Sequence, residues 1–354
     1  MGRAARWFLN SGIQEPSGGV ARYYYSDRGQ NARVSTEITG YAVSFLTYAY
    51  GRTAEAEYLE AAERGARFLV REAWNPGLAL FPYEYPLTRD VCPLAYFFDS
   101  GIIIRGLLQI WRVTGEREFL DVATAAGHGM LKHFPGPEGL HPILHLPECT
   151  PLEYHAQWSA SPGCYQLKAA MAWQDLYEVT GQQEFHAAYE AEMERAVATH
   201  LAFLPGASIQ EKVMDRLHAY SYFVEAMLPR ADRAECQDAY RIGMDRIEHY
   251  LNQISPVFVR SDVYGQLLRA RVFAAELGIA PLDETAAERE ARAAARFQFH
   301  SDDPRFDGGF GFGLQRGQVV PFVNPVSTAF CAQALDMWQL HCSGGPAPRH
   351  EVLV

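Results

Sequence analysis

Residues 100–134 read SGIIIRGLLQIWRVTGEREFLDVATAAGHGMLKHF, and this stretch decides the fold. Its first half carries apolar residues at 102–104, 107–108 and 110–111 and leaves hardly any polar face. Such a pattern predicts a helix that is covered on nearly all sides. In the second half, apolar residues from Phe119 to Met130 fall on one stripe and charged residues face away, which predicts an amphipathic outer helix. A Val-Thr-Gly turn separates the two.

The same unit recurs along the chain. Residues 164–204 read CYQLKAAMAWQDLYEVTGQQEFHAAYEAEMERAVATHLAFL and repeat the apolar helix, the Val-Thr-Gly turn and a second helix that opens with charged residues and a Phe. The glycines predicted to mark three of the turns, Gly51, Gly115 and Gly181, are 64 and 66 residues apart. A spacing this regular indicates an internal repeat. Further hairpins are predicted at residues 37–74, 215–251 and 262–297.

A sixth inner helix is expected after Asn324, in VSTAFCAQALDMWQL, and no outer helix follows it. Residues 3–9 at the other end of the chain are predicted to supply that partner and so close a ring. Six buried helices inside six amphipathic ones predict an all-α protein, an (α/α)6 toroid with small β-hairpins in its long loops. We expect one toroid domain over residues 1–342 and a flexible C-terminal tail over residues 343–354, which are rich in Gly and Pro.

Composition narrows the classes of function. The chain has 354 residues and a net charge of −11, which argues against nucleic acid and anionic membrane surfaces as partners. No apolar run approaches the ~20 residues of a membrane span, and the N-terminal run is too short for a secretion signal. The six cysteines form no CxxC pair and are interpreted as free thiols in a reducing compartment. We therefore expect a cytoplasmic protein without a cofactor, and leave a homodimer open.

The predicted loops differ in length at the two ends of the ring. Connections from inner to outer helix are short, as at residues 51–53, whereas those from outer to inner helix are long, as at residues 135–162 and 298–323. In an up-and-down ring all the long connections lie at one end, beside the N-termini of the inner helices. Long loops on a rigid scaffold commonly carry function. We therefore expect the functional site at this end, which we call the mouth.

Several carboxylates are predicted to gather at the mouth. Glu37, Asp99 and Asp215 each stand near the start of a predicted inner helix, as does Asp262. A carboxylate there is also explained by capping or by the helix dipole, but its recurrence favours a shared site. Paired carboxylates suit glycosidic bond cleavage, in which one donates a proton and the other acts as base or nucleophile. Glu37 and Asp99 are the acid/base candidates.

Two histidines are alternative bases. His218 lies near the start of an inner helix and His155 lies in a long loop, and a histidine could remove a proton next to a carboxylate, as an epimerase or a lyase requires. His141 and His145 have the i, i+4 spacing of zinc ligands, but Pro142 disrupts a regular helix there and no third ligand is evident. No metal site is predicted.

Aromatic and polar residues of the same loops and helix ends suit a sugar, because aromatic rings stack on the CH faces of sugars and carboxylates accept hydrogen bonds from hydroxyl groups. The predicted platforms are Tyr83, Tyr85, Trp158 and Phe312. The other predicted binding residues are Tyr41, Glu84, Tyr165, Tyr222, Arg316 and Asn324. Any one of these aromatic residues could instead pack a loop onto the ring.

The alternation of inner and outer helices resembles the toroids of six-hairpin glycosidases and terpenoid cyclases. Residues 13–19, IQEPSGG, and residues 36–41, TEITGY, are similar to six-hairpin proteins associated with polysaccharide biosynthesis. Residues 308–310, GGF, and 324–330, NPVSTAF, fit the same likeness. The architecture covers nearly the whole chain, whereas the motifs cover only its two ends.

This resemblance implies a carbohydrate ligand and, for an enzyme, hydrolase, lyase or uronyl-epimerase activity on an oligo- or polysaccharide. The likeness to the 2-epimerases of acylated amino sugars is one of shape and carries over no residue. A non-catalytic glycan-binding or scaffold protein of a polysaccharide pathway is the competing hypothesis. An isoprenoid cyclase or prenyltransferase is a lesser one, because the sequence has no DxDD acid motif and no Asp/Cys/His zinc set.

Overall fold

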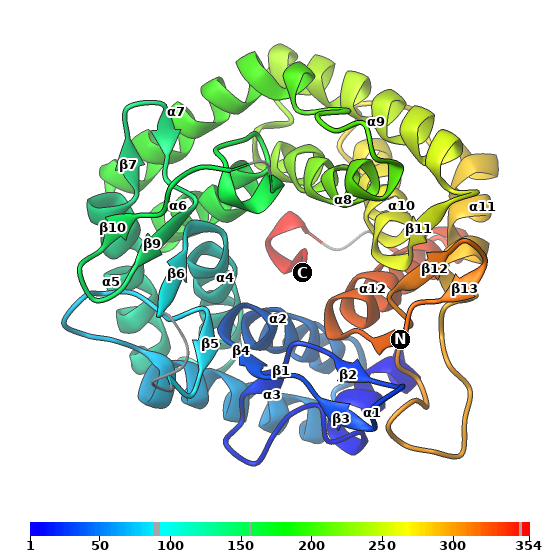
Figure 1. The fold of residues 1–354 in the computed structure, drawn as a ribbon, viewed down its shortest axis with the longest axis horizontal. Coiled ribbons are helices and arrows are strands. Elements are labelled where there is room, and N and C mark those ends of the chain that lie inside the picture. Colours follow the sequence, from blue (N-terminus) through cyan, green and yellow to red (C-terminus); the bar gives the residue numbers. More distant parts are fainter. Residues whose placement is uncertain (88–92, 156, 347–348) are drawn as a thin grey trace.

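The computed structural model describes residues 1–87, 93–155, 157–346 and 349–354. Twelve α-helices in this part of the chain form two concentric rings (Figure 1). The inner ring consists of α2 (Thr36–Thr53), α4 (Phe97–Thr114), α6 (Gln166–Thr180), α8 (Gln210–Ala226), α10 (Ser261–Glu276) and α12 (Pro325–Cys342). The outer ring consists of α1 (Gly2–Asn10), α3 (Ala56–Phe68), α5 (Arg117–His133), α7 (Gln183–Thr199), α9 (Ala234–Ile254) and α11 (Glu284–Ala295). The predicted (α/α)6 toroid is confirmed.

Helix α1 closes the ring as predicted. It packs against α2, α3 and α12, so the first helix of the chain is the outer partner of the last one. Its buried face consists of Ala4, Ala5, Trp7 and Phe8. The indole Nε1 of Trp7 donates a hydrogen bond of 2.9 Å to the carbonyl oxygen of Arg305, in the loop before α12. The two ends of the helical sequence are thus joined by packing and by this hydrogen bond.

Inner helices approach one another closely where both carry small residues. A Cβ atom added at Gly101 in α4 would lie 2.4 Å from the carbonyl oxygen of Ala169 in α6. One added at Gly106 would lie 2.6 Å from the carbonyl oxygen of Gly40 in α2. Since real Cβ contacts are longer than this, these glycines set the spacing of α2, α4 and α6.

The hairpin turns follow the predicted pattern with one correction. Gly115 and Gly181 adopt left-handed conformations, with φ of 71° and 72°, and end α4 and α6. Gly51 was predicted to mark the first turn but lies inside α2, which continues to Thr53. There Ala54 takes the left-handed position, with φ of 58°. Beyond Gly51, Arg52 of the same helix pairs with Asp336 of α12 at 2.8 Å.

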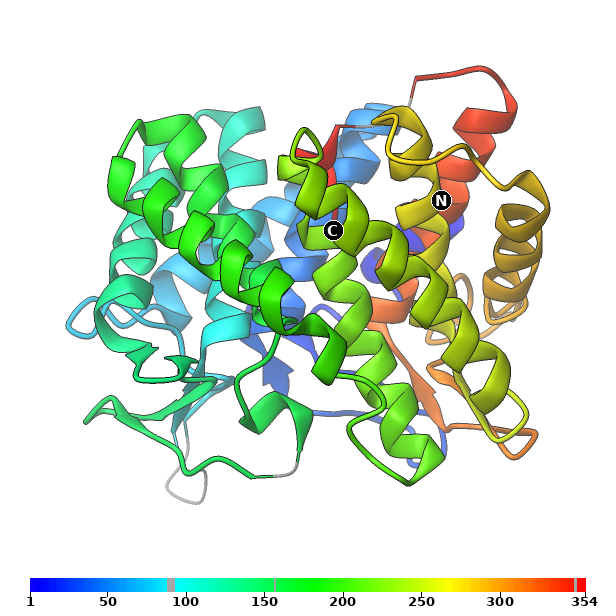
Figure 2. The same cartoon turned by 90° about the horizontal axis from the view of Figure 1, so that it is seen from above.

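All strands are short and lie in the long connections. Four three-stranded antiparallel sheets have the orders β1-β4-β5, β10-β9-β6, β11-β12-β13 and β14-β2-β3, and β7 pairs with β8. Their bounds are Val20–Ala21 (β1), Tyr24–Tyr25 (β2), Gln30–Asn31 (β3), Val34–Ser35 (β4), Glu84–Tyr85 (β5), Leu94–Tyr96 (β6), Pro135–Gly136 (β7), Gly139–Leu140 (β8), Ile143–His145 (β9), Thr150–Pro151 (β10), Phe258–Arg260 (β11), Gly313–Gln315 (β12), Gln318–Val319 (β13) and Phe322–Val323 (β14). The side view places these strands and the long loops at one end of the ring, as predicted (Figure 2).

Short helical turns complete the backbone. Residues Leu69–Ala73 form a π-helical turn that continues α3, and 3-10 turns lie at Trp158–Ala160, His200–Ala202, Leu228–Arg230 and His350–Val352. In the described part of the chain no helix is both long and apolar enough to cross a membrane. Five cysteines, Cys149, Cys164, Cys236, Cys331 and Cys342, are free thiols, and Cys92 lies outside the described residues.

The C-terminal residues occupy the centre of the ring, where the prediction was a flexible tail (Figure 1). Leu353 and Val354 are 1% and 2% exposed. The main-chain oxygen of Val354 accepts hydrogen bonds from Lys168 at 3.4 Å and Arg269 at 3.1 Å. Arg105 donates to the carbonyl oxygen of Leu353 at 3.0 Å. The prediction is wrong for residues 349–354, because the inner helices hold buried donors that this segment satisfies.

Below the mouth, the ring is filled by layers of buried side chains. Arg105 pairs with Asp175 at 2.9 Å, and Glu225 pairs with both Lys168 at 3.0 Å and Arg269 at 2.6 Å. All five side chains are at most 3% exposed. These ion pairs and the C-terminal segment together close the ring at the end opposite the mouth.

Candidate functional site

A cavity of about 270 Å³ opens at the mouth. It lies among the N-terminal turns of inner helices and the long loops, as the loop-length argument predicted. Its lining consists of Glu37, Ile38, Tyr83, Tyr96, Phe98, Asp99, Pro142, Gln157, Trp158, Ser159, Tyr165, His218, Tyr222, Arg260, Asp262, Asn324 and Val326. We refer to it as the central cavity.

Two carboxyl groups of neighbouring inner helices face the central cavity. The hydroxyl of Ser35 caps α2 by accepting a hydrogen bond from the amide of Ile38, and this places Glu37 in the first turn. Asp99 lies in the first turn of α4 and does not cap it, because α4 already begins at Phe97. Asp99 is 5% exposed, and its Oδ2 has no hydrogen-bond partner among the described residues.

Both carboxyl groups are harder to ionise than usual. Burial raises the pKa of Glu37 to about 7, although the nearby Arg22 opposes the shift. Burial, followed by the charge of Glu37, raises the pKa of Asp99 well above its ordinary value, and Arg22 again opposes. The two carboxyl groups titrate together, and their raised pKa values indicate that the pair retains a proton near neutral pH.

Arg22 stands behind the wall that Tyr83 forms. Its guanidinium lies 4.1 Å from the centroid of the Tyr83 ring and pairs with Glu84 at 3.0 Å. Glu84 also pairs with Arg33 at 2.9 Å. Glu84, a predicted binding residue, is therefore engaged by two arginines and does not line the central cavity.

The opposite wall holds a second charged group. Arg260 of β11 pairs with Asp262 at 2.7 Å and with Asp215 at 3.0 Å. His218 Nδ1 lies 2.9 Å from Gln266 Oε1 and 3.5 Å from an oxygen of Asp262. Burial, followed by the charge of Arg260, lowers the pKa of His218 to about 3, so the imidazole is neutral at pH 7. A neutral imidazole whose Nδ1 donates to Gln266 leaves Nε2 as an acceptor.

Aromatic rings form much of the remaining lining. Trp158 meets Tyr165 edge to face with centroids 5.0 Å apart, and Tyr83 lies 4.5 Å from Tyr96. Tyr222 lies 4.8 Å from Phe98. Rings held in this way offer fixed apolar surfaces beside the carboxyl groups, which is the combination expected of a sugar site.

The structure brings eight of the fifteen predicted site residues into the central cavity lining: Glu37, Asp99, His218, Tyr83, Trp158, Tyr165, Tyr222 and Asn324. The side-chain oxygen of Asn324 also caps α12, since it accepts a hydrogen bond of 3.0 Å from the amide of Ser327.

Seven predicted residues lie outside the lining. His155 is exposed on a loop, and only its carbonyl oxygen is engaged, by the hydroxyl of Ser161. Asp215 pairs with Arg260 from a partly exposed position, because α8 begins at Gln210 and places this residue in its second turn. Arg316 is exposed beside β12 and pairs with Glu211 at 3.3 Å. Glu84, which pairs with Arg22 and Arg33, also lies outside the lining.

The other three are aromatic residues used in packing. Tyr41 is 1% exposed and meets Phe330 edge to face. The ring of Tyr85 packs on Phe68, since β5 pairs with β4. Phe312 lies under the guanidinium of Arg260 at 4.6 Å.

The prediction missed several lining residues, above all Tyr96, Phe98 and Arg260. Tyr96 and Phe98 flank the predicted candidate Asp99, and their proximity to it was a usable signal. Arg260 precedes Asp262 by two residues in the strand before α10, and an Arg-x-Asp pattern at a helix start could have drawn attention to it.

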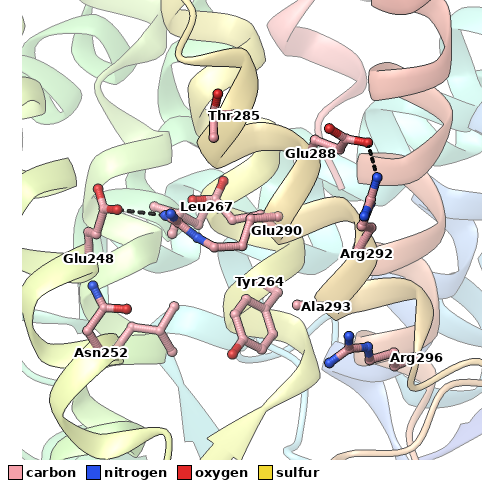
Figure 3. A pocket seen from close by; sticks show the side chains of 12 residues that line it. Glu248, Asn252, Tyr264, Leu267, Thr285, Glu288, Glu290, Arg292, Ala293 and Arg296 are labelled. Carbon is pink, nitrogen blue, oxygen red and sulfur yellow. Dashed lines mark hydrogen bonds and ion pairs between the residues drawn. The ribbon is translucent and has the colours of Figure 1, made fainter.

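A different pocket, of about 400 Å³, lies on the outer wall between α9, α10 and α11 (Figure 3). Two ion pairs of its lining are Arg289 with Glu248 at 2.7 Å and Arg292 with Glu288 at 2.5 Å. This pocket is lined by residues of α9, α10 and α11 and contains none of the predicted site residues, so we assign the candidate function to the central cavity.

His141, one of the two histidines with zinc-like spacing, contacts a tyrosine. His141 Nδ1 lies 2.7 Å from the hydroxyl of Tyr154, which occupies that nitrogen. Within the described ranges, one group of three side chains has its ligand atoms within 4.8 Å of one another: Glu178, His350 and Glu351. This group lies at the end of the ring opposite the central cavity.

No protein-family model matches the chain, and its sequence matches no curated protein. Solved structures do share its fold. Cellobiose 2-epimerase from Spirochaeta thermophila aligns with a TM-score of 0.72 over 94% of both chains at 14% identity. D-mannose isomerase aligns with a TM-score of 0.67 over 95% of both chains at 11% identity. Unsaturated glucuronyl hydrolase from Bacillus sp. GL1 aligns with a TM-score of 0.65, over 94% of this chain and 95% of its own, at 14% identity.

At these identities the likeness concerns the fold. It confirms the predicted six-hairpin toroid and leaves the reaction to be argued from the site.

Proposed function

We propose that this protein is a carbohydrate-active enzyme that acts on an oligo- or polysaccharide in the central cavity. The observation that carries the proposal is the pair of carboxyl groups, Glu37 and Asp99, which share one aromatic-lined cavity and have raised pKa values. Groups with strongly shifted pKa values in a cleft are characteristic of catalytic sites. The saccharides in the names of the neighbouring structures support the same class of substrate.

The two carboxyl groups have separate roles in the proposed hydrolysis. Asp99, protonated at neutral pH, donates its proton to the glycosidic oxygen as the bond to the anomeric carbon breaks. Glu37, whose pKa is about 7, is ionised in a large fraction of molecules and acts on the anomeric carbon, either directly as nucleophile or by taking a proton from water. The anomeric configuration of the first product distinguishes these two courses.

The cavity dimensions favour one end of a glycan chain. A volume of about 270 Å³ is near the lower limit for ligand sites, ~300 Å³. Below the cavity the ring is closed by the ion pairs of Arg105, Lys168 and Arg269 and by the C-terminal segment. A long glycan cannot pass through the ring, so we propose that a terminal sugar enters and that Trp158 and Tyr83 contact its faces.

A second candidate is proton abstraction by His218, as an epimerase or a lyase requires. It is favoured by the placement of His218, whose Nδ1 is held by Gln266 and lies near Asp262, which leaves Nε2 as the acceptor for a substrate proton. A carboxylate beside a histidine orients it for such a role. In this scheme Glu37 and Asp99 bind hydroxyl groups.

The test is product analysis by mass spectrometry with a panel of neutral and uronic-acid oligosaccharides in deuterated water. Hydrolysis gives shortened products, and elimination gives shortened products with one unsaturated end. Epimerisation gives deuterium uptake without shortening. We expect shortened, saturated products, lost in Glu37→Gln and Asp99→Asn and retained in Glu211→Gln, a carboxylate variant of the first turn of α8 outside the cavity.

The outcomes separate the alternatives. If the protein incorporates deuterium and the His218→Gln variant does not, His218 is the base and the second candidate is supported. Saturable binding with no product on any substrate would favour the glycan-binding hypothesis. Full turnover in both Glu37→Gln and Asp99→Asn would refute the carboxyl pair.

A further inference from the structure

Three side chains with metal-binding groups meet where the C-terminal segment contacts the ring. Glu178 lies in the last turn of α6, and His350 and Glu351 lie in the 3-10 turn His350–Val352. One ligand atom from each lies within 4.8 Å of the others. Glu178 and His350, which are 172 positions apart in the sequence, are thus brought together at the end opposite the mouth.

Two polar atoms on these side chains are buried without a partner. His350 Nε2 and Glu351 Oε2 are enclosed and form no hydrogen bond with the described residues. Leaving such atoms unsatisfied costs about 1–3 kcal/mol each, so a buried polar atom without a partner calls for an explanation. Two orphaned atoms beside a third carboxylate point to a ligand that all three can share.

The surrounding groups leave room for a cation. Gln174 donates a hydrogen bond of 3.0 Å to Glu178 Oε1, and Arg349 pairs with Glu351 Oε1. In each carboxylate, Oε1 accepts a hydrogen bond from a neighbouring side chain. Oε2 of each carboxylate is left for a ligand. Glu351 is paired with the guanidinium of Arg349, whereas Glu178 accepts a hydrogen bond from a neutral amide. The carboxylate of Glu178 therefore brings a negative charge that an incoming divalent cation can balance.

The backbone around the group is fixed independently of any metal. Arg105 donates to the carbonyl oxygen of His350 at 3.4 Å, and Gln109 donates to that of Glu351 at 3.1 Å. Both donors belong to the inner helix α4. These hydrogen bonds fix the main chain of His350 and Glu351. A bound metal therefore needs to order only the two side chains.

We propose that Glu178, His350 and Glu351 bind a divalent transition metal of the Zn²⁺ class, which fastens the C-terminal segment to α6. One imidazole nitrogen and two carboxylate oxygens are ligands that Zn²⁺ accepts, at about 2.0–2.2 Å, with water completing a tetrahedron. Ligand atoms up to 4.8 Å apart can reach that geometry by small side-chain rotations, because Glu178 is exposed and its hydrogen bond with Gln174 engages only one carboxylate oxygen. The site is independent of the proposed reaction and lies at the other end of the ring.

The experiment is a Zn²⁺ titration of the full chain against a chromophoric chelator, with the variants Glu178→Gln and His350→Gln. We expect one Zn²⁺ per chain and an affinity at least about 10- to 100-fold lower in each variant. The matched control is His128→Gln, because His128 Nδ1 lies 3.1 Å from one carboxylate, Glu184, on the outer helices and has no second carboxylate partner. This variant should bind Zn²⁺ as the parent does.

A second measurement tests the fastening itself. Arg349 is 83% exposed in its side chain, so trypsin can cleave after it and release residues 350–354 when the segment loosens. Zn²⁺ should slow this cleavage in the parent and in His128→Gln, but not in Glu178→Gln. Equal Zn²⁺ affinity in the parent and both site variants, or cleavage that Zn²⁺ leaves unchanged, would overturn the proposal.

Discussion

Replacement of Glu37 by Gln distinguishes a functional carboxylate from a structural one, because the two predict opposite signs of the change in stability. A glutamate in the first turn of a helix is ordinarily stabilising, by about 0.3–1 kcal/mol, through the helix dipole. If that were the role of Glu37, Glu37→Gln would lower the free energy of unfolding. The structure instead gives this carboxyl a raised pKa, so its ionised form destabilises the fold.

The magnitude follows from the pKa. A rise from 4.5 to about 7 corresponds to a penalty of up to about 3 kcal/mol above pH 7, at about 1.4 kcal/mol for each tenfold change in proton affinity. Below pH 4.5 both folded and unfolded states are protonated and the penalty vanishes. Between pH 4.5 and 7 the unfolded state loses its proton first, so the stability of the parent falls as pH rises. Since Glu37 keeps part of its surface accessible in the cavity, about 3 kcal/mol is an upper bound.

The assay is urea unfolding of the parent and of Glu37→Gln from pH 4 to 8. The two unfolding free energies should agree near pH 4 and separate toward pH 7, with the variant more stable. Glu211→Gln is the control of opposite sign: Glu211 also lies in a first turn, but its own backbone amide and Arg316 lower its pKa. A Glu37→Gln variant that is less stable than the parent at pH 7 would refute the reasoning. It would show that Glu37 stabilises α2 through the helix dipole.

Three further predictions address binding, the buried ion pairs and helix packing. Trp158→Ala should weaken saccharide binding about tenfold, through loss of ring stacking worth ~0.5–1.5 kcal/mol beyond buried area, and an unchanged Kd in calorimetry would exclude this platform. Arg105→Met should lower the free energy of unfolding by about 3–5 kcal/mol, because Asp175 is left buried and unpaired, and urea unfolding measures it. Gly101→Ala should cost about 1–3 kcal/mol, since its Cβ would lie 2.4 Å from a carbonyl oxygen of α6. Gly51→Ala, with nothing within 4 Å, should stabilise α2 by up to about 1 kcal/mol, and equal effects of the two glycine variants would contradict the packing argument.

The sequence predicted the ring because each hairpin repeats a local signal. The apolar run before Gly115 and the amphipathic stripe after it define an inner and an outer helix without reference to the rest of the chain. The turn at Gly51 was misplaced because a glycine can also lie inside a helix, and here α2 continues to Thr53 with Ala54 in the left-handed position. Local pattern alone does not decide between a glycine inside a helix and one at its end.

The site was predicted in part for a similar reason. Helix N-termini converge at the mouth in any toroid of this type, so carboxylates there, such as Glu37 and Asp99, could be found by position. Loop residues could not, because their direction depends on strand pairing. Tyr83 and Tyr85 are two residues apart, and one faces the cavity whereas the other packs on Phe68. Arg22 affects both carboxyl groups from a loop whose path the sequence does not reveal.

The buried charges at the ring centre connect the fold to the proposed reaction. The ion pairs comprise three cations, Arg105, Lys168 and Arg269, and only two carboxylates, so some donors lack an ionised partner. Main-chain oxygens of the C-terminal segment accept hydrogen bonds from all three cations, which gives partners to several of their donors, although Arg269 Nε has none among the described residues. In the described part of the chain, this layer and the ion pairs close the ring beneath the carboxyl pair, whose burial raises the pKa of Asp99. We therefore propose the mouth as the route by which a sugar enters and leaves.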